Sequence, residues 1–459
     1  MKNMSLKTIA QVVDGQLYFP LDYEVEDNKV IAGVVTDNRQ IEKDFLFIPM
    51  VGARVDGHDF IEDAFEKGAY AVLSQKKLDN PKGPYILVKD TPTSLKQIAT
   101  YYRQQLSIPL IGVIGSVGKT STKEMIASVL SAKYEVLKTE GNYNKEIGLP
   151  LTVLRIRDYH QVAVVEMGIS DFGEMHRLGD IAKPDYVVIT NIGQCHLEFL
   201  HNRDGILRAK TEVFEHMPSS GCVILNGDDD KLIDADTLGL KTIYYGLGEH
   251  EYSASNVEAD GVTGIKADIH TPLGDISVKI PLPGEHNVMN GLAAAALGLQ
   301  LGLDLENITD GLNHAKTISG RNNLMVVNGI TIIDDCYNAN PVSMKASIEV
   351  LGKATGRTIA VLGDMGELGD KEVELHANLS QVIEDNQICM LFTVGTLSEN
   401  IHTTLQQHNS SCMCHHYGKV EDLLTDLLPV LRVGDTVLIK ASHFMNFPVI
   451  VDAIKKRFE

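Results

Sequence analysis

The stretch from residue 110 to 125 joins a short apolar run, a glycine-rich turn and an amphipathic helix. It reads LIGVIGSVGKTSTKEM. The generic phosphate-binding motif has a glycine at the position of Val113, so this turn is a tighter variant of the motif. Glycines let backbone N–H groups approach phosphate oxygens, and the start of a helix adds partial positive charge. In such a loop Lys119 reaches the β- and γ-phosphates and the Thr120 hydroxyl ligates Mg²⁺. The stretch predicts an ATP-phosphate loop with the candidate contacts Gly115, Ser116, Val117, Gly118, Lys119, Thr120 and Ser121.

An α/β fold of three domains is predicted, because short apolar runs alternate with amphipathic stretches along most of the chain. A chain of 459 residues is also too long for one compact core. A β-rich insert is expected at residues 265–280, and Asn328-Gly329 between two apolar runs predicts a hairpin. The predicted domains cover residues 1–106, 107–318 and 319–459, and the phosphate loop opens the central domain on a parallel sheet.

Composition excludes several classes of protein. The net charge of -20 argues against non-specific binding to nucleic acid or to anionic membranes. The six cysteines are sparse, and the run from Cys412 to His416 matches no zinc spacing, so a reducing cytoplasm is expected. The N-terminus lacks an apolar signal core, and the apolar stretch 291–303 is too short to span a bilayer. We expect a cytoplasmic, monomeric protein without membrane insertion.

Polar residues capable of chemistry follow several of the predicted strands. Ligands of open parallel sheets bind outside the carboxyl ends of the strands, so these residues predict one shared cleft. They are Glu166, His196, Asp334, Asp335, Asp364 and Lys440.

A phosphate loop alone does not distinguish a kinase, an ATPase and a ligase, but further motifs do. GSVGKTSTKEM is followed by TEGNYNKEIGLPLTVL, EMG, NIGQCHLE, AKTEVFE and GEHNVMNGLAAAA. TDNR and DFLFIPMVGARVDGHDF precede them, and DDCYNANPVSMKASI and VLGDMGELG come later. Over essentially the whole chain this order resembles the Mur ligase family. The resemblance implies an N-terminal UDP-sugar-binding α/β domain, a central P-loop ATPase-type domain and a C-terminal Rossmann-like domain.

The family resemblance implies an activity: a substrate carboxylate attacks ATP to give an acyl phosphate, and an amine then attacks the carbonyl. The run YNANP at 337–341 implies D-alanyl-D-alanine as the amine and UDP-N-acetylmuramoyl tripeptide as the carboxylate, giving a peptidoglycan precursor. The alternatives left open are another amino-acid ligase of the family, a folate ligase, and a P-loop ATPase or kinase module.

Catalytic and metal-binding roles are implied in the same way. Thr120 and Glu166 resemble the ligands of ATP-bound Mg²⁺, and His196 resembles a second-metal ligand or acyl-phosphate contact. Lys210 matches a lysine that the family carbamoylates, which would help to hold a second Mg²⁺. With Lys119 these residues form the expected catalytic set.

Binding roles complete the implied site. The nucleotide contacts beyond the loop are Asn287, Asn290, Arg321, Asp335 and Tyr337. The substrate contacts are Thr36, Asp37, Asn38, Arg39, His58, Asn142, Asn144, Lys440 and Ser442. Two departures from the family pattern concern the substrates: Asn38 replaces a usual serine, and His443 replaces a usual arginine, which removes a permanent charge near the expected dipeptide site.

Overall fold

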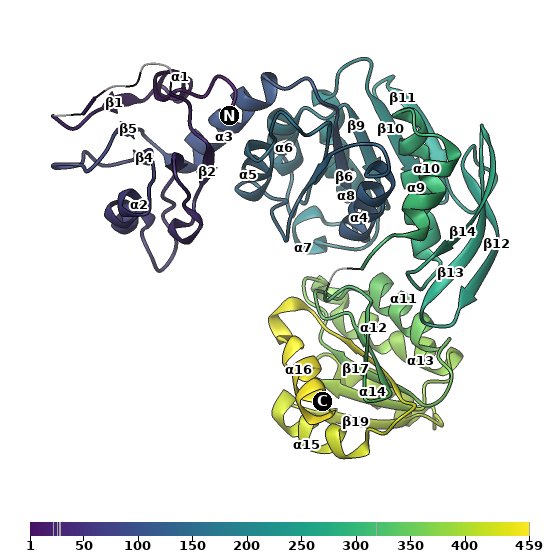
Figure 1. The fold of residues 1–459 in the computed structure, drawn as a ribbon. Coiled ribbons are helices and arrows are strands. Elements are labelled where there is room, and N and C mark those ends of the chain that lie inside the picture. The colour runs from purple at the N-terminus through teal and green to yellow at the C-terminus, as the bar shows by residue number, and fades with distance from the viewer. Residues whose placement is uncertain (22, 25, 27–28, 318, 459) are drawn as a thin grey trace.

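A computed structural model describes residues 1–21, 23–24, 26, 29–317 and 319–458. The chain forms three bodies in sequence order, coloured purple, blue to teal, and green to yellow (Figure 1). The N-terminal body lies to one side of the central body, and the C-terminal body lies below the central one. None of the helices within the described residues has the length and apolar character needed to cross a membrane.

The N-terminal body is a five-stranded sheet in the order β1-β5-β4-β3-β2, in which only β1 is antiparallel to its neighbour. Ser5 caps its first helix by accepting a hydrogen bond from the Thr8 backbone N–H at 3.2 Å. The last helix, α3, reaches the central body, where the Tyr102 hydroxyl donates to the Ile156 carbonyl at 2.6 Å. The elements are α1 (Leu6–Val12), β1 (Gln16–Tyr18), β2 (Gly33–Val35), β3 (Phe45–Phe47), α2 (Ile61–Glu66), β4 (Ala71–Ser74), β5 (Tyr85–Leu87) and α3 (Thr91–Gln104).

The central body is built on a six-stranded parallel sheet in the order β11-β10-β9-β6-β8-β7. Its middle strands are buried on both faces, which explains their continuous apolar runs. The elements are β6 (Leu110–Ile114), α4 (Lys119–Leu130), β7 (Val136–Lys138), α5 (Gly148–Leu154), β8 (Val162–Glu166), α6 (Glu174–Ala182), β9 (Tyr186–Ile189), α7 (Leu197–Leu200), α8 (Arg203–Thr211), the 3₁₀ helix η3 (Glu212–His216), β10 (Cys222–Asn226) and β11 (Lys241–Tyr245).

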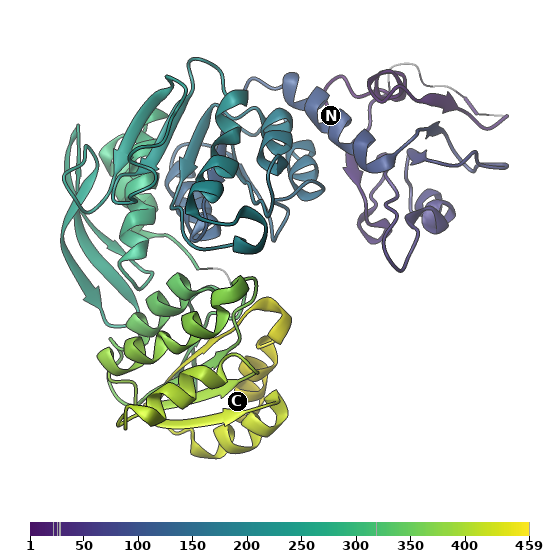
Figure 2. The same cartoon turned by 180° about the vertical axis from the view of Figure 1, so that it is seen from behind.

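The β-rich insert predicted at residues 265–280 is a three-stranded antiparallel sheet that begins earlier, at Ser253. It flanks the central body and extends toward the C-terminal one (Figure 2). Val262, in the turn between its first two strands, packs against the core of the C-terminal body. The insert and the helices that follow are β12 (Ser253–Asp260), β13 (Gly264–Thr271), β14 (Gly274–Ile280), α9 (His286–Gln300) and α10 (Leu305–Asn313).

The C-terminal body has a six-stranded sheet in the order β15-β16-β20-β17-β18-β19, parallel except for the edge strand β15. Asn328 and Gly329 both have positive φ and form the predicted hairpin turn. The elements are β15 (Asn323–Val327), β16 (Ile330–Asp334), α11 (Pro341–Leu351), β17 (Thr358–Gly363), α12 (Glu372–Ala377), α13 (Leu379–Asp385), β18 (Met390–Val394), α14 (Glu399–Gln407), β19 (Met413–Tyr417), α15 (Val420–Val430), β20 (Thr436–Lys440) and α16 (Pro448–Phe458).

The predicted α/β fold with parallel sheets is thereby confirmed. The run from Cys412 to His416, whose spacing matched no zinc signature, forms most of edge strand β19.

Candidate active site

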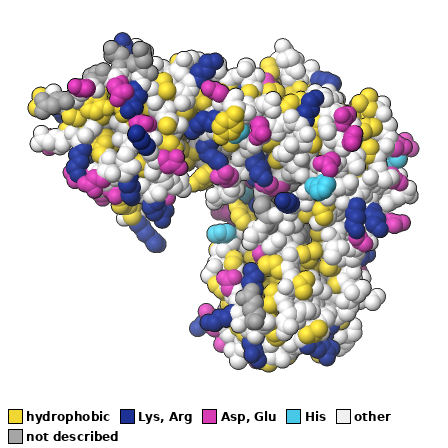
Figure 3. Space-filling model, viewed as in Figure 1, with side chains coloured by type: hydrophobic (Ala, Val, Ile, Leu, Met, Phe, Trp, Pro, Cys, Tyr) yellow, Lys and Arg dark blue, Asp and Glu magenta, His cyan; other side chains and the backbone are white. Residues whose placement is uncertain are grey.

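A cleft of about 1000 Å³ lies between the central and C-terminal bodies. The molecular surface is hollowed where the bodies face one another (Figure 3). The central body lines the cleft with the phosphate loop, Glu166 and His196, and the C-terminal body contributes Arg321, Asp335 and other residues. A cleft of this size between two bodies is a typical ligand site, and it brings together most of the predicted strand-end residues.

Two glycines give the phosphate loop its shape. Gly115 has a φ of +155°, and a Cβ there would lie 1.9 Å from Oγ1 of Thr190, so a side chain would collide. Gly118 has a φ of +83° and forms the N-cap of α4. The loop therefore directs backbone N–H groups and the start of α4 into the cleft, as an anion site requires.

The segment after β9 holds the phosphate loop in place. Oγ1 of Thr190 donates to the Val117 carbonyl at 2.6 Å. The Asn191 amide accepts from the Val117 N–H at 3.0 Å and donates to the same residue's carbonyl at 3.1 Å. Sequence reasoning singled out His196 in NIGQCHLE but missed Thr190 and Asn191. Their position at a strand end was the available signal.

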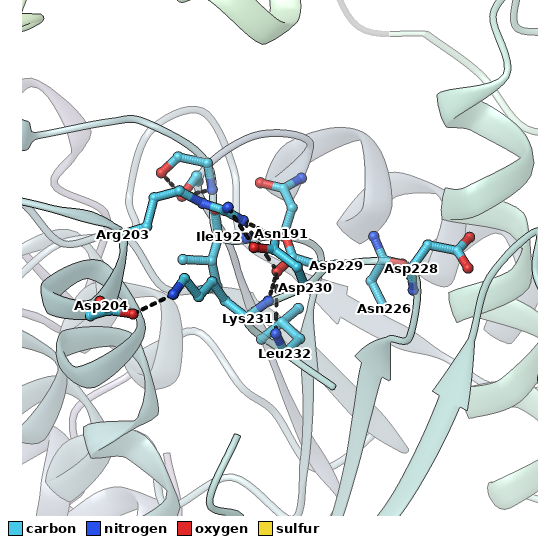
Figure 4. A network of polar contacts seen from close by, with 12 residues as sticks. Asn191, Ile192, Arg203, Asp204, Asn226, Asp228, Asp229, Asp230, Lys231 and Leu232 are labelled. Atoms are coloured by element: carbon cyan, nitrogen blue, oxygen red, sulfur yellow. Dashed lines mark hydrogen bonds and ion pairs between the residues drawn. The ribbon is translucent and has the colours of Figure 1, made fainter. Parts of the chain in front are cut away.

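A network of charged side chains anchors this supporting segment (Figure 4). The Ile192 N–H donates to Oδ2 of Asp229 at 2.8 Å, and Nε of Arg203 donates to the Ile192 carbonyl at 2.7 Å. Arg203 also pairs with Asp230. The start of α8 and the turn after β10 thus fix the segment on which the phosphate loop rests.

Thr120 and Glu166 present hard oxygen atoms beside the phosphate loop. The Thr120 hydroxyl donates to Oε2 of Glu166 at 2.8 Å, and the Asn144 amide donates to Oε1 of Glu166 at 2.7 Å. Both Thr120 and Glu166 are buried, and both line the cleft. One carboxylate and one hydroxyl suit Mg²⁺, which keeps several water ligands, so these residues fit the predicted metal role.

Two lysine amines meet beneath the loop. Nζ of Lys119 donates to the Gly115 carbonyl at 2.8 Å, and Nζ of Lys210 donates to the same oxygen at 3.1 Å. Burial lowers the pKa of Lys119. Burial, and then repulsion from Lys119, lowers the pKa of Lys210 to about 8. Lys210 is only 2% exposed, although its place on a helix would by itself suggest a surface lysine.

His196 faces the C-terminal body. Its Nδ1 lies 2.8 Å from Oε2 of Glu367 without meeting hydrogen-bond geometry. Burial lowers the pKa of His196, and the nearby Glu367 opposes that effect. Both residues have positive φ, at +52° and +61°. Sequence reasoning missed Glu367, although it lies in the quoted run VLGDMGELG.

The start of α9, which holds two of the predicted nucleotide contacts, is tied to α4. The Asn290 amide donates to Oδ1 of Asn287 at 3.1 Å, while Oδ1 of Asn290 accepts from the Thr122 hydroxyl at 2.7 Å. Asn287 does not cap α9, since its amide donates to the Pro283 carbonyl at 2.8 Å. Both asparagines line the cleft.

Arg321 and Tyr337 form the opposite wall. The guanidinium carbon of Arg321 lies 4.0 Å from the centre of the Tyr337 ring. The His443 ring stands edge-on to Tyr337, with the centroids 6.0 Å apart. The pair offers a flat cationic surface to a ligand in the cleft.

Asp335 and Lys440 form a buried ion pair between the ends of β16 and β20. Nζ of Lys440 lies 2.5 Å from Oδ2 of Asp335, which also accepts from the Ser347 hydroxyl at 2.6 Å. Both charged residues line the cleft. Ser442, a predicted substrate contact, is buried and does not line the cleft; its hydroxyl accepts from the Gly366 N–H at 2.9 Å.

Two of the strand-end aspartates accept hydrogen bonds from backbone N–H groups and do not line the cleft. Asp364 accepts hydrogen bonds from the N–H groups of residues 396–398, and Asp334 accepts from the N–H groups of Gly320 and Cys336. The expectation that polar residues after the strands share one cleft was therefore correct for the edge of the sheet, but it included two residues that stabilise loops.

The predicted UDP-sugar residues lie apart from the cleft, in the N-terminal body. Asp37 pairs with the exposed Arg39 at 2.7 Å, which lowers the pKa of Asp37. The Asn38 amide donates to Asp63 at 2.7 Å. Nε2 of His58 accepts from the Gln75 N–H, so its Nδ1–H donates to Asp56. Thr36 follows β2 and is half-buried. Asn142 and Asn144, by contrast, line the cleft.

Fold and site together define a nucleotide-dependent ligase of three bodies, and comparison with known proteins identifies its family. Family models match residues 30–103 (Mur ligase family, catalytic domain), 113–298 (Mur ligase middle domain) and 320–443 (Mur ligase, glutamate ligase domain). The UDP-N-acetylmuramoyl-tripeptide–D-alanyl-D-alanine ligase of Bacillus subtilis is 41% identical over 454 residues, which cover 97% of each chain. The chain belongs to the Mur ligase family.

Solved structures agree with that assignment. A crystal structure of MurF from Acinetobacter baumannii superposes with a TM-score of 0.87 at 29% identity and covers 99% of both chains. A MurF ligase from Thermotoga maritima, in complex with ADP, has a TM-score of 0.82 at 28% identity and covers 93% of this chain and 97% of its own. The predictions of family and of ATP use are therefore confirmed.

Proposed function

We propose that this chain joins D-alanyl-D-alanine to the terminal carboxylate of UDP-N-acetylmuramoyl tripeptide, using ATP and Mg²⁺. The observation that carries the proposal is the cleft itself. It sets the phosphate loop, Thr120 and Glu166 on one side and Arg321 and the Asp335–Lys440 pair on the other. The relatives named for this activity match the chain along nearly its whole length.

The proposed reaction builds negative charge on phosphate and then on a tetrahedral carbon, so positioned cations carry most of its catalysis. The loop N–H groups and Lys119 would hold the phosphates, with Thr120 and Glu166 as ligands of Mg²⁺. Bound Mg²⁺ would neutralise phosphate charge and orient the attack. Arg321 would stabilise charge from the C-terminal body, which therefore has to be in place before the chemistry.

Lys210 is proposed to act as a carbamate. Its amine is buried beside the Gly115 carbonyl, and lowering its pKa to about 8 increases the neutral fraction at neutral pH. A neutral amine attacks CO₂ and releases one proton to solvent, and the resulting carbamate is an anion with two oxygen atoms. Such an anion close to Lys119 would replace the repulsion between two ammonium groups with attraction, and it would offer a ligand to a second Mg²⁺. His196 is the proposed neighbour of that metal or of the acyl phosphate.

The UDP-sugar end of the substrate is proposed to bind the N-terminal body at Thr36, Asp37, Asn38, Arg39 and His58. The Arg39 side chain is 82% exposed; its Nε and Nη2 donate to Asp37, and the remaining N–H groups of the guanidinium suit a diphosphate. The dipeptide is proposed to bind near Lys440, Ser442 and His443, on the C-terminal side of the cleft. All six cysteines, which lie in the described part of the chain, are free thiols, and this supports a cytoplasmic location.

The test combines phosphate release from ATP with mass spectrometry of the product. Phosphate release that needs both the UDP-linked tripeptide and D-alanyl-D-alanine, with a product heavier by one dipeptide residue, is the expected result. Release that proceeds without the tripeptide, or a product lacking the dipeptide, would reject the proposal. A single D-alanine serves as the matched control for the amine, and it should give no product.

A further inference from the structure

Two imidazoles and one carboxylate converge where α6 packs against η3, on the central body and outside the cleft residues. They belong to His176, Glu215 and His216, whose ligand atoms lie within 4.8 Å of one another. Nδ1 of His176 lies 3.2 Å from Oε2 of Glu215 and 3.1 Å from Nε2 of His216. The two imidazole rings stand edge to face with their centroids 4.4 Å apart.

No single placement of protons gives a separate hydrogen bond to each of the two close contacts of His176 Nδ1. If Nδ1 of His176 carries a proton, one N–H has to be shared between Glu215 and the lone pair of His216. If Nδ1 is unprotonated, it accepts a hydrogen bond from Nε2–H of His216. No proton then lies between Nδ1 and the Glu215 carboxylate. A single cation among the three atoms would accept a lone pair from each of them at once.

The surrounding structure positions the backbone that carries the cluster and the ring of His216. The Glu212 carboxylate accepts from the N–H groups of Gly173 and His176 at 3.0 and 3.1 Å, which ties η3 to the start of α6. Gly179 leaves room for the second imidazole, because a Cβ there would lie 2.7 Å from Cδ2 of His216. The backbone that carries the three residues and the ring of His216 are thus fixed, while His176 and Glu215 are more than half exposed and accessible to an ion from solvent.

We propose that His176, Glu215 and His216 form a binding site for a divalent transition-metal ion of the zinc, nickel and copper class. Two imidazole nitrogens and a carboxylate oxygen suit these ions, and the exposure of the cluster leaves further coordination positions to water. Mg²⁺ prefers an all-oxygen octahedron and is not expected here. A bound ion would brace α6 against η3, which directly follows the helix that carries Lys210.

The experiment is a titration of NiCl₂ into the full chain, stripped with a chelator and kept in millimolar Mg²⁺, followed by calorimetry. The wild-type chain should bind one equivalent that His176→Ala loses, and Glu215→Gln should weaken this binding by at least about tenfold. His314→Ala is the matched control, because exposed His314, which follows α10, pairs with exposed Asp310 at 3.0 Å and belongs to no three-ligand group among the described residues. It should leave the titration unchanged.

Thermal unfolding supplies a second measurement, since an ion that binds only the folded chain raises the midpoint. Nickel should raise the midpoint of the wild-type and His314→Ala chains but not that of His176→Ala. If His176→Ala fails to fold, Glu215→Gln decides the question alone. Equal nickel stoichiometry and affinity in the wild-type chain and in the cluster variants would overturn the proposal, as would the lack of any submillimolar nickel binding by the wild-type chain.

Discussion

Lys440→Met should destabilise the C-terminal body, because it leaves the carboxylate of Asp335 buried without its cation. The side chains of Lys440 and Asp335 are only 3% and 10% exposed, and their charged atoms lie 2.5 Å apart. Removing one partner of a buried ion pair costs about 3–5 kcal/mol. The Ser347 hydroxyl and the Asn322 N–H still donate to Asp335, so we expect a value near the lower limit, about 3 kcal/mol.

Hydrogen exchange followed by mass spectrometry measures this change locally, whereas global unfolding of three bodies is not a two-state process. A loss of about 3 kcal/mol corresponds to exchange roughly 100-fold faster, and it should appear in β16 and β20 but not in β6. The double variant Asp335→Asn/Lys440→Met leaves no buried charge and should recover most of the loss. Less than tenfold acceleration in Lys440→Met, or additive losses in the double variant, would refute the reasoning.

Three further predictions concern the cleft. Lys119→Ala should lower kcat/KM by about 10²-fold or more, because it removes a cation aimed at developing phosphate charge, whereas Lys133→Ala on the same body should not. Arg321→Lys should raise the KM for ATP by about two- to fivefold through loss of its stacking on Tyr337, and an unchanged KM in steady-state kinetics would count against that contact. The ¹³C carbamate signal of Lys210 in labelled bicarbonate should weaken as pH falls through about 8, because the amine becomes protonated. A signal that does not depend on pH, or one that Lys210→Ala retains, would contradict the assignment.

The parts of the fold with strong local patterns were predictable from sequence. The phosphate loop lies between β6 and α4, and the Asn328-Gly329 turn joins β15 to β16, as predicted. These features depend on residues close together in the chain. The division between the first two bodies stays a prediction, since Arg103 of α3 donates to the Ala182 carbonyl at 2.8 Å and couples them.

The site was less predictable because side-chain direction depends on distant partners. Asp335 points to Lys440 and lines the cleft, while neighbouring Asp334 binds backbone N–H groups on its own side of β16. No sequence pattern separates the two aspartates. The position of Asn191 after a strand was a signal that it faces the site, but its support of the loop could not be predicted, because its partner Val117 lies 74 positions earlier in the chain.

The most direct test of the account follows oxygen from the carboxylate. The UDP-linked tripeptide, labelled with ¹⁸O in its terminal carboxylate, is incubated with ATP, Mg²⁺ and D-alanyl-D-alanine, and the released phosphate is analysed by mass spectrometry. Attack of the carboxylate on the γ-phosphate predicts one ¹⁸O atom in each phosphate, together with a product extended by the dipeptide. Unlabelled phosphate alongside that product would contradict the acyl-phosphate route, and labelled phosphate without the extended product would contradict the assigned amine.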